Sequence, residues 1–337
     1  MAGRELPARG RPAPVTMGES RSHADPTLWV ICPVLLDVAS FVELRDRLCT
    51  EVAEGLPVPV GDVRFVVVDD SAGADLEMDG LTDLADVQVC TPPFNLGHQR
   101  AIVFGLRVIA PELEDRDYVV TMDSDGEDRP EDVPRLLAGL TEAGDRLEAG
   151  ALALRGRRKE ALSFRVLYAA FRVLFRALTG TQIKTGNFAV QRGWFIRNAL
   201  FHPSFDLCYS TSLLALRRPL VFVECDRGTR YAGESRMHTY RLVAHGVRMM
   251  LPFTERIAVR ILTTSLLFGF IATLSGVTLL VLLMAGSPGT TPVGVAFLGS
   301  LILTLVTFTG FLALFSGSAH SSAIGMQGLE GSPSHSA

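Results

Sequence analysis

Short apolar runs alternate with segments of helical periodicity between residues 28 and 154. The runs are rich in valine, isoleucine and leucine and predict buried strands, and the apolar residues between them recur every three or four positions, as in helices that pack on a sheet. The predicted strands are Leu28–Val34, Val63–Asp69, Val87–Cys90, Tyr118–Met122 and Gly150–Leu154. The predicted helices are Phe41–Glu54, Gln99–Ala110 and Glu131–Leu140. This alternation predicts an α/β domain with a mostly parallel sheet, in which ligands bind at the carboxyl ends of the strands.

Two uncharged stretches follow near the C-terminus, Ile261–Ala285 and Pro292–Ser316. Each exceeds the roughly 20 residues that cross a bilayer as a helix, and the short linker between them predicts a transmembrane hairpin. The arginines on the side where the first stretch begins are Arg241, Arg248, Arg256 and Arg260. The positive-inside rule therefore predicts an integral protein of the inner (cytoplasmic) membrane, with its N-terminal domain and C-terminal tail in the cytosol. The alternative is a buried hairpin of a soluble protein, although such helices normally have a polar face.

Two amphipathic segments predict helices that lie on the membrane surface. Ala161–Leu178 places arginines at helical spacing among Leu, Val and Phe, and Tyr240–Pro252 repeats the pattern beside the first apolar stretch. For each segment alone, an amphipathic core helix with a solvated arginine face is an equally good interpretation. The predicted parts of the chain are a disordered arm (1–27) without the apolar region of a signal peptide, a folded domain (28–239), an interfacial helix (240–260), two membrane helices (261–285 and 292–316) and a disordered cytosolic tail (317–337).

Charge is distributed unevenly along the 337 residues. The net charge is −4, yet residues 28–154 carry 26 acidic and 9 basic side chains, whereas residues 155–260 carry 6 acidic and 19 basic ones. The first part is suited to holding cations and the second to meeting phosphates or an anionic membrane surface, unless the two are unrelated solvated surfaces. A hydrophobic share of 48% favours a membrane-embedded part. The five cysteines contain no CxxC pair and indicate reduced thiols in a cytosolic domain.

The acidic segment after the fourth predicted strand is the strongest chemical signal. The strand runs directly into Asp123-Ser124-Asp125-Gly126-Glu127-Asp128. Carboxylates at positions i and i+2 just beyond a strand can share one hard divalent cation, which in turn bridges the phosphates of a nucleotide sugar. We therefore expect Asp123 and Asp125 to bind a metal ion, the alternative being a solvated acidic loop.

Two further segments are predicted at the same edge of the sheet. Asp69 and Asp70 end the second strand, where a carboxylate can accept a hydrogen bond from a nucleobase N–H or a ribose hydroxyl. Asn95 and Gly97 lead into a helix in which Gly105 permits close approach, so that Asn95 or backbone N–H groups face the donor. Taken alone, either segment is more often an ordinary turn or helix cap.

Several other chemistries are disfavoured because their sequence patterns are missing. The seven histidines form no ligand-spaced cluster, and the chain has no GxGxxG or GxxxxGK[ST] phosphate loop and no hydrolase elbow. Gln191-Arg192-Gly193-Trp194 departs from the Gln-x-x-Arg-Trp of processive polysaccharide synthases. Two membrane helices are also few for a secretion channel.

Six short motifs follow one another along the chain, each occurring once. They are Asp69-Asp70-Ser71, Asn95-x-Gly97, Asp123 to Glu131, Arg155-Gly-Arg157-Arg158, Gly186-Asn187-Phe188 and Arg227 to Arg236. In this order and spacing they resemble the polyprenyl-phosphate glycosyltransferases of glycosyltransferase family 2, which include dolichyl-phosphate mannose synthases and bacterial bactoprenol glucosyltransferases. The resemblance extends from residue 28 to the end of the second apolar stretch. No single motif is decisive, but together with the C-terminal hairpin they are specific.

The resemblance implies a GT-A nucleotide-sugar-binding domain with a Rossmann-like, mostly parallel sheet. It implies that Asp69 or Asp70 contacts the nucleoside. It further implies that Asp123 and Asp125 hold the diphosphate and Mg²⁺ or Mn²⁺, with Glu127 joining the metal ligands. The residues that would meet phosphates are Arg227, Arg230, Ser235 and Arg236, and the alternative for these arginines is a membrane-surface patch.

Two departures from the family pattern concern the site. The first strand of the family usually leads into Pro-Val-Tyr-Asn-Glu, which touches the nucleotide, whereas this chain reads Pro33-Val34-Leu35-Leu36-Asp37. A Gly-Asp-Phe-Arg-Leu-like segment reads Gly186-Asn187-Phe188-Ala189-Val190, so an amide stands at the position of the proposed base. The resemblance keeps Pro33 and Asp37 as candidate nucleotide contacts, and Asn187 and Arg230 as candidate catalytic residues.

The predicted reaction moves a sugar from a UDP- or GDP-linked donor to a polyprenyl phosphate at the cytosolic membrane face, with a metal ion and inversion at the anomeric carbon. A phosphate monoester is largely dianionic at pH 7, so no strong base is required. The alternatives are a diacylglycerol or envelope-glycan acceptor on the same fold, or a catalytically degenerate membrane scaffold. We expect no nucleic-acid partner. The sequence leaves the oligomeric state open, a homo-oligomer included.

Overall fold

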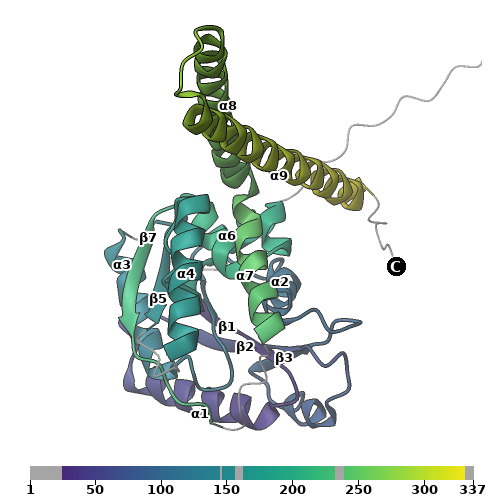
Figure 1. The fold of residues 1–337 in the computed structure, drawn as a ribbon. Helices are drawn as coiled ribbons and strands as arrows, with labels where there is room; N and C mark the ends of the chain where they lie inside the picture. The colour runs from purple at the N-terminus through teal and green to yellow at the C-terminus, as the bar shows by residue number, and fades with distance from the viewer. Residues whose placement is uncertain (1–24, 145, 156–161, 232–238, 331–337) are drawn as a thin grey trace, which may run out of the picture.

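Seven strands form one mixed sheet in the computed structural model, which describes residues 25–144, 146–155, 162–231 and 239–330 (Figure 1). Their order is β3-β2-β1-β4-β6-β5-β7, and among these strands only β6 runs antiparallel to its neighbours. The strands are β1 (Thr27–Val34), β2 (Asp62–Asp69), β3 (Val87–Cys90), β4 (Tyr118–Thr121), β5 (Gly150–Arg155), β6 (Thr185–Arg192) and β7 (Leu220–Cys225). Because β1 to β4 are parallel, their carboxyl ends lie along one edge of the sheet.

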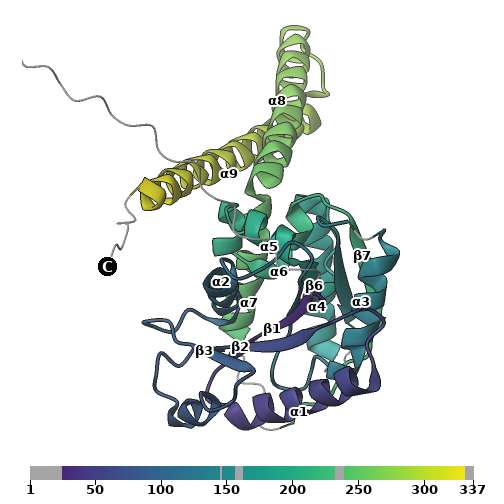
Figure 2. The same ribbon diagram turned by 180° about the vertical axis from the view of Figure 1, so that it is seen from behind.

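Helices cover both faces of the sheet (Figure 1; Figure 2). Alternate side chains of β1 point to opposite faces, with Leu28 and Val30 packed against α1 and α3, and Trp29 and Ile31 packed against α2, α5 and α6. Burial on both sides explains the continuous apolar run of this strand. The helices are α1 (Val38–Glu54), α2 (His98–Ile109), α3 (Val133–Glu142), α5 (Gly193–Ala199) and α6 (Tyr209–Ala215).

The mostly parallel α/β sheet predicted from the sequence is confirmed. All five predicted strands and all three predicted helices are present, with ends within three residues of the expected positions. The hydrophobic pattern does not predict β6 and β7. β6 reads Thr-Gly-Asn-Phe-Ala-Val-Gln-Arg and is almost wholly buried between β4 and β5. Because polar residues stand at both of its ends, its sequence lacks the apolar run that predicts a buried strand.

The two predicted amphipathic segments are helical and meet at the base of the C-terminal helices. They form α4 (Leu162–Thr179) and α7 (Thr239–Met250). Phe175 of α4 packs with Phe253 and Ile257 in a small core of its own. Ile257 belongs to α8 (Thr254–Met284), which passes Ile261 without a break. The predicted start of the membrane helix is therefore an interior position of a helix already anchored in the folded domain.

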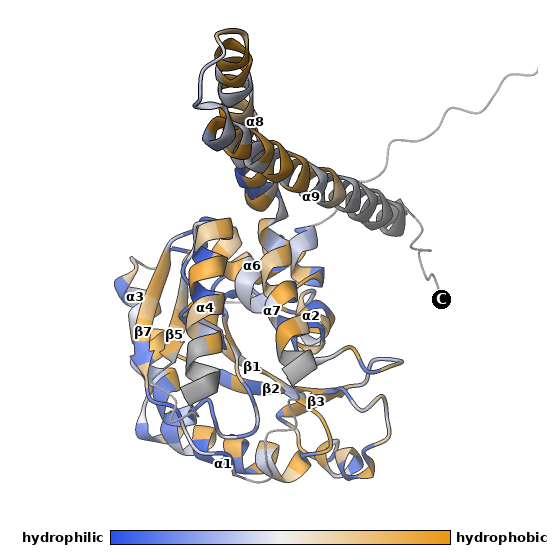
Figure 3. Ribbon diagram, in the orientation of Figure 1, coloured by the Kyte–Doolittle hydropathy of each residue, from blue (hydrophilic) through white to orange (hydrophobic). Residues whose placement is uncertain are grey.

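Helices α8 and α9 (Thr290–Glu330) extend away from the sheet and are apolar along most of their length (Figure 3). Two segments, Val243–Met284 and Thr290–Ala313, are long and apolar enough to cross a membrane, and 6% of the most apolar window of each is buried. By length and composition they agree with the predicted hairpin.

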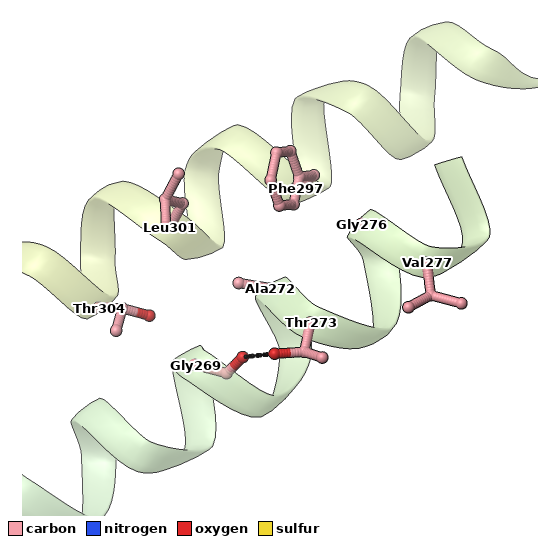
Figure 4. A pocket seen from close by; sticks show the side chains of 8 residues that line it. All are labelled: Gly269, Ala272, Thr273, Gly276, Val277, Phe297, Leu301 and Thr304. Atoms are coloured by element: carbon pink, nitrogen blue, oxygen red, sulfur yellow. Dashed lines mark hydrogen bonds between the residues drawn. The ribbon is translucent and has the colours of Figure 1, made fainter. Parts of the chain in front are cut away.

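Small residues set the packing of α8 on α9 (Figure 4). A β-carbon on Gly276 would lie 3.0 Å from the ring of Phe297, and the Ser265 hydroxyl donates to the Thr304 carbonyl at 3.3 Å. A hollow of about 260 Å³ remains between the helices beside Gly269. Small side chains permit this close approach in an apolar surrounding.

The C-terminal helix is longer than predicted. α9 continues to Glu330, whereas composition predicts a disordered tail from residue 317. Proline is absent between residues 317 and 330, so each backbone N–H in this stretch can extend the helix. Residues 331–337 of the tail and residues 1–24 of the predicted arm lie outside the described part of the chain.

We predict that Gly105→Ala destabilises the domain. A β-carbon at Gly105 would lie 2.6 Å from Val68 Cγ2 and 3.1 Å from Ile31 Cγ2, so α2 would have to move away from the sheet. Overpacking of this kind costs about 1–3 kcal/mol and should lower the thermal unfolding midpoint of the detergent-solubilised protein. Gly80→Ala is the control, because no atom lies within 4 Å of its would-be β-carbon. Equal midpoints for the two variants would contradict the close packing.

Candidate active site

The loop between β4 and the 3-10 helix η2 (Pro130–Asp132) gathers four carboxylates at the carboxyl edge of the sheet. Residues 122–129 are called the acidic loop. The buried Asp128 carboxylate accepts the Asp123 N–H, and Asp125 accepts the Glu127 N–H, both at 3.0 Å. These bonds close a tight turn and leave Asp123 and Asp125 partly accessible, with 16% and 18% of their side-chain surface exposed.

A second loop, residues 226–231 after β7, lies directly against the acidic loop and is called the basic loop. Two backbone hydrogen bonds of 3.0 Å join them: Gly228 N–H donates to the Glu127 carbonyl, and Tyr231 N–H donates to the Asp125 carbonyl. The two loops are about 100 residues apart in the chain, so this contact is set by the order of the strands.

Two glycines make the contact between these loops possible. Gly126 has a φ of +88°, and a β-carbon there would lie 2.9 Å from the Thr229 carbonyl oxygen. A β-carbon on Gly228 would collide with the Gly126 carbonyl oxygen. Any larger residue at either position would push the two loops apart.

Two arginines of the basic loop pair with Asp125 and Glu127 of the acidic loop. Arg230 Nη2 lies 2.9 Å from Asp125 Oδ2, and Arg230 Nε donates to Glu127 at 3.3 Å. Arg227 pairs with the same glutamate. Glu127 was expected among the metal ligands, but its carboxylate is engaged by two guanidinium groups. The two remaining predicted phosphate contacts, Ser235 and Arg236, lie outside the described residues.

The donor set at Asp123 and Asp125 fits a divalent cation that is shared with a nucleotide. Burial, and then the charge of Asp123, raise the pKa of Asp125 above its ordinary value, so the two carboxylates repel each other. Among the described residues, no group of three or more His, Cys, Asp or Glu side chains is arranged to hold a metal ion. Mg²⁺ nevertheless needs one or two carboxylates when water and phosphate oxygens complete its coordination.

Asn187, near the start of β6, connects the acidic loop to α2. Its Nδ2 donates to Asp123 Oδ1 at 3.2 Å and contacts His98 Nε2, while its Oδ1 accepts from Gln99 Nε2. His98 Nε2 in turn lies 3.0 Å from Asp123 Oδ1. The amide therefore presents N–H groups to Asp123. An aspartate at this position would place two carboxylates face to face.

Buried groups beneath Asn187 fix its orientation. Gln99 Oε1 accepts the Ser210 N–H at 3.0 Å, which turns Gln99 Nε2 toward Asn187. The Thr121 hydroxyl donates to the Asn187 carbonyl at 2.6 Å and lies 3.0 Å from the Tyr209 hydroxyl. Burial raises the pKa of Tyr209 to about 12, so the phenol keeps its proton and donates it to Thr121. Gln99 thus holds the side-chain amide of Asn187, and Thr121 holds the main-chain carbonyl of the same residue.

Asp69 and Asp70 organise the neighbouring backbone. Each oxygen of Asp69 accepts one N–H of the following turn, at 3.0 and 2.9 Å. Asp70 Oδ1 accepts the N–H of Gly97 at 3.2 Å and that of the preceding residue at 2.7 Å, and Asn95 donates to the Asp70 carbonyl at 2.6 Å. Burial raises the pKa of Asp70. The structure therefore brings Asp70, Asn95 and Gly97 together and joins the turn after β2 to the start of α2.

Pro33 and Asp37 flank the loop after β1 at the same edge. The Ser124 hydroxyl donates to the Pro33 carbonyl at 3.3 Å, which ties the end of β1 to the acidic loop. Asp37 precedes α1 and makes no side-chain capping bond to it. Between them Leu35 and Leu36 are 50% and 55% exposed, so this edge carries an apolar patch beside the carboxylates.

Three residues at this edge were not identified from the sequence as candidate site residues: His98, Gln99 and Tyr231. A signal was available for the first two, because they open α2 directly after Gly97, where side chains face an edge that already holds carboxylates. Tyr231 reaches the acidic loop from a distant part of the chain, and no local pattern marks it.

One contact joins the first turn of α8 to the segment that leads into β6 and Asn187. Arg256 of α8 donates to the Thr181 hydroxyl at 3.4 Å, and Thr181 precedes Asn187 by six residues. Six extended residues span at most about 21 Å. Thr181 therefore lies within roughly that length of Asn187, and the Arg256 side chain adds its own reach to the separation of α8 from the site.

Comparisons with known proteins give one family match and distant structural likenesses. Residues 46–201 match the family model described as Glycosyl transferase family 2. Glucosyl-3-phosphoglycerate synthase from Mycobacterium tuberculosis, in complex with Mn²⁺, uridine diphosphate and glucosyl-3-phosphoglycerate, is 16% identical with a TM-score of 0.41, over 69% of this chain and 80% of that one. The mannosyltransferase PcManGT from Pyrobaculum calidifontis, in complex with GDP-Man and Mn²⁺, is 14% identical with a TM-score of 0.36, over 88% and 87% of the two chains. No curated protein matches the sequence.

The family match covers part of the candidate site and leaves out Pro33, Asp37 and the basic loop. It includes the acidic loop, the start of α2 and Asn187, all of which the sheet order brings to one edge. The mixed sheet with helices on both faces and an acidic loop after β4 is the GT-A architecture that the resemblance implied. Residues 46–201 thus match a glycosyl transferase family 2 domain over just under half of the chain, and this match supports a glycosyltransferase.

Proposed function

We propose that this protein transfers a sugar from a UDP- or GDP-linked donor to a polyprenyl phosphate at the cytosolic face of the inner membrane. The observation that carries the proposal is the short connection between Thr181, which contacts the first turn of α8, and Asn187 at the site. A soluble donor and a lipid-borne acceptor can meet only where a catalytic edge lies close to the bilayer. The long apolar helices α8 and α9 supply the membrane attachment.

The donor is proposed to bind across the ends of β1, β2 and β4. Asp70, Asn95 and Gly97 would surround the nucleoside, with Pro33 and Asp37 on the opposite side of it. Asp123 and Asp125 would hold Mg²⁺ or Mn²⁺, which neutralises the charge on the departing nucleoside diphosphate. Arg227 and Arg230 lie beside the carboxylates of the acidic loop. Each guanidinium group can donate two hydrogen bonds to the oxygens of one phosphate.

The acceptor needs little activation by the protein. Its phosphate oxygen attacks the anomeric carbon, the bond from that carbon to the diphosphate oxygen breaks, and the configuration inverts. A phosphate monoester has a second pKa near 6 and is already nucleophilic at pH 7. Asn187 therefore has no proton to remove. We assign to it the positioning of Asp123 through the 3.2 Å hydrogen bond.

The test is transfer by the purified full-length protein. Radiolabelled nucleotide sugars are offered with a polyprenyl phosphate, with diacylglycerol or with an envelope glycan, and the label in the lipid or glycan fraction is measured. Transfer to polyprenyl phosphate is expected. Transfer to one of the other two acceptors instead would select the alternative acceptor, and no transfer from any donor would favour the degenerate scaffold.

We predict that Asp125→Asn and Asp123→Asn lower transfer by at least about a hundredfold, because a bound metal supplies several kcal/mol of charge stabilisation. Both variants should keep the unfolding midpoint of the wild type, since both side chains are partly exposed. Asp83→Asn, an exposed carboxylate outside the site, is the control. The direct measurement is Mn²⁺ binding by electron paramagnetic resonance alongside turnover. Undiminished turnover in EDTA would remove the metal from the proposal.

We predict that Asn187→Ala lowers turnover by about ten- to a hundredfold, the effect of one hydrogen bond to a charged group. Asn187→Asp should be no more active than wild type, because its carboxylate would face Asp123 across the 3.2 Å contact. Turnover is measured from pH 6 to 9, with Asn198→Ala on α5 as the control. An inactive wild type that gains activity as Asn187→Asp would show that a base is required.

We predict that the loop between α8 and α9 faces away from the cytosol. Ser287→Cys should react with a membrane-impermeant maleimide added to intact cells, while tags at residue 1 and after residue 337 should be reached only after the membrane is opened. The hairpin topology rests on the arginines before Ile261. A tail tag accessible from outside would mean that one of the two spans is wrongly assigned.

A further inference from the structure

Arginines of the first turns of α8 anchor this helix to the folded domain. Arg256 Nη2 donates to the Ala215 carbonyl at the end of α6, at 3.0 Å. Arg260 Nη1 donates to the carbonyls of Arg176 and Ala177 in the last turn of α4. Positive charge at the C-terminus of a helix is favourable. These contacts place the two guanidinium groups at fixed positions just before the apolar run of α8.

A hollow of about 540 Å³ lies beside this anchor. It is lined by Val173, Arg176, Ala177 and Gly180 of α4 and its end, and by Arg260. Gly180 has a φ of +74°, and a β-carbon there would collide with Arg260 Nη2, so glycine opens the space that the guanidinium occupies. Val173 is 71% exposed and forms an apolar wall.

Carbonyl groups at helix ends meet the guanidinium groups of Arg256 and Arg260, but among the described residues no carboxylate pairs with the arginines that line the hollow. Arg217 and Arg260 lie close enough to Arg256 for their charges to repel it. Within the part of the chain that the structure describes, Arg176 and Arg260 form no ion pair with a carboxylate, in contrast to Arg227 and Arg230 at the acidic loop. A cluster of like charges without a counterion is costly, and an anion would relieve it.

We propose that this hollow binds the phosphate of an anionic phospholipid of the surrounding bilayer, contacted by Arg176 and Arg260. The residue after Arg260 begins the long uncharged stretch, so the hollow lies at the level where lipid headgroups would surround α8. Val173 would contact the first carbons of the acyl chains, as apolar residues near the membrane surface do. A guanidinium can pair two phosphate oxygens, which favours it over a lysine.

The site is separate from the proposed acceptor site. Arg227 and Arg230 belong to the basic loop and lie against the acidic loop, whereas Arg176 and Arg260 lie at the junction of α4 and α8. The inference rests on the proposed membrane location of α8 and not on the chemistry of sugar transfer. Lipid binding and turnover can therefore be measured independently on one preparation.

The test is native mass spectrometry of the full-length protein in detergent, titrated with phosphatidylglycerol or phosphatidylcholine. Wild type should bind phosphatidylglycerol more tightly. Arg176→Gln should weaken that binding about fivefold, the effect of one arginine near a membrane surface, and Arg176→Lys should weaken it less. Arg64→Gln, which removes an equal charge on β2, should bind as wild type does. Turnover of Arg176→Gln is recorded as a separate readout.

Equal affinity of wild type for the two phospholipids, or equal losses in Arg176→Gln and Arg64→Gln, would overturn the proposal. A polyprenyl phosphate is titrated in a third arm. If Arg176→Gln weakened its binding and left that of phosphatidylglycerol unchanged, the hollow would be part of the acceptor site, and the phospholipid assignment would be wrong. Unfolding of Arg176→Gln, whose side chain is exposed, is checked by its charge-state distribution.

Discussion

The pairing of opposite charges between the acidic and basic loops is the interaction on which the catalytic edge depends. Asp125 is largely buried near Asp123, and the upward shift of its pKa reflects the cost of confining two negative charges there. Arg227 and Arg230 offset that cost across an interface that two backbone hydrogen bonds close. Binding of a metal-bound diphosphate would require Asp125 to pair with the metal ion in place of Arg230. Arg227 and Arg230 would then pair with phosphate oxygens.

At the base of α8, confined positive charges are likewise stabilised by groups of opposite polarity, here the carbonyl groups at helix ends. Arg256 and Arg260 were expected as surface charges that mark the cytosolic side of a membrane helix. In the structure their guanidinium groups also satisfy carbonyls at the ends of α6 and α4, where positive charge is favourable. Since α8 continues without a break into its apolar part, the folded domain determines where that part begins. The position of this apolar part relative to the folded domain then follows from helix packing and not from a flexible linker.

Asn187 shows how a departure from a family pattern can be compatible with activity. An aspartate there would add a third negative charge beside Asp123, whereas the amide donates to it. Gln99 holds the side-chain amide in this orientation and Thr121 holds the main-chain carbonyl of Asn187, and both are themselves fixed by residues near the start of α6. Under the proposed function, Asn187 would orient a carboxylate, where an aspartate would accept a proton. A dianionic acceptor makes that change chemically acceptable.

The sequence by itself determined the parallel part of the sheet, the helices between its strands, the two apolar helices and the acidic residues after β4. These features are local, because strand and helix periodicity and the run of carboxylates can be read within a few residues. Tertiary structure alone decided that β6 runs antiparallel and that Arg227 and Arg230 face Asp125 and Glu127. It also decided that Arg260 of α8 donates to carbonyl groups in the last turn of α4. Each of these depends on residues about 30 to 100 positions apart. The pairing of such residues follows from strand order and helix packing, which no local pattern encodes.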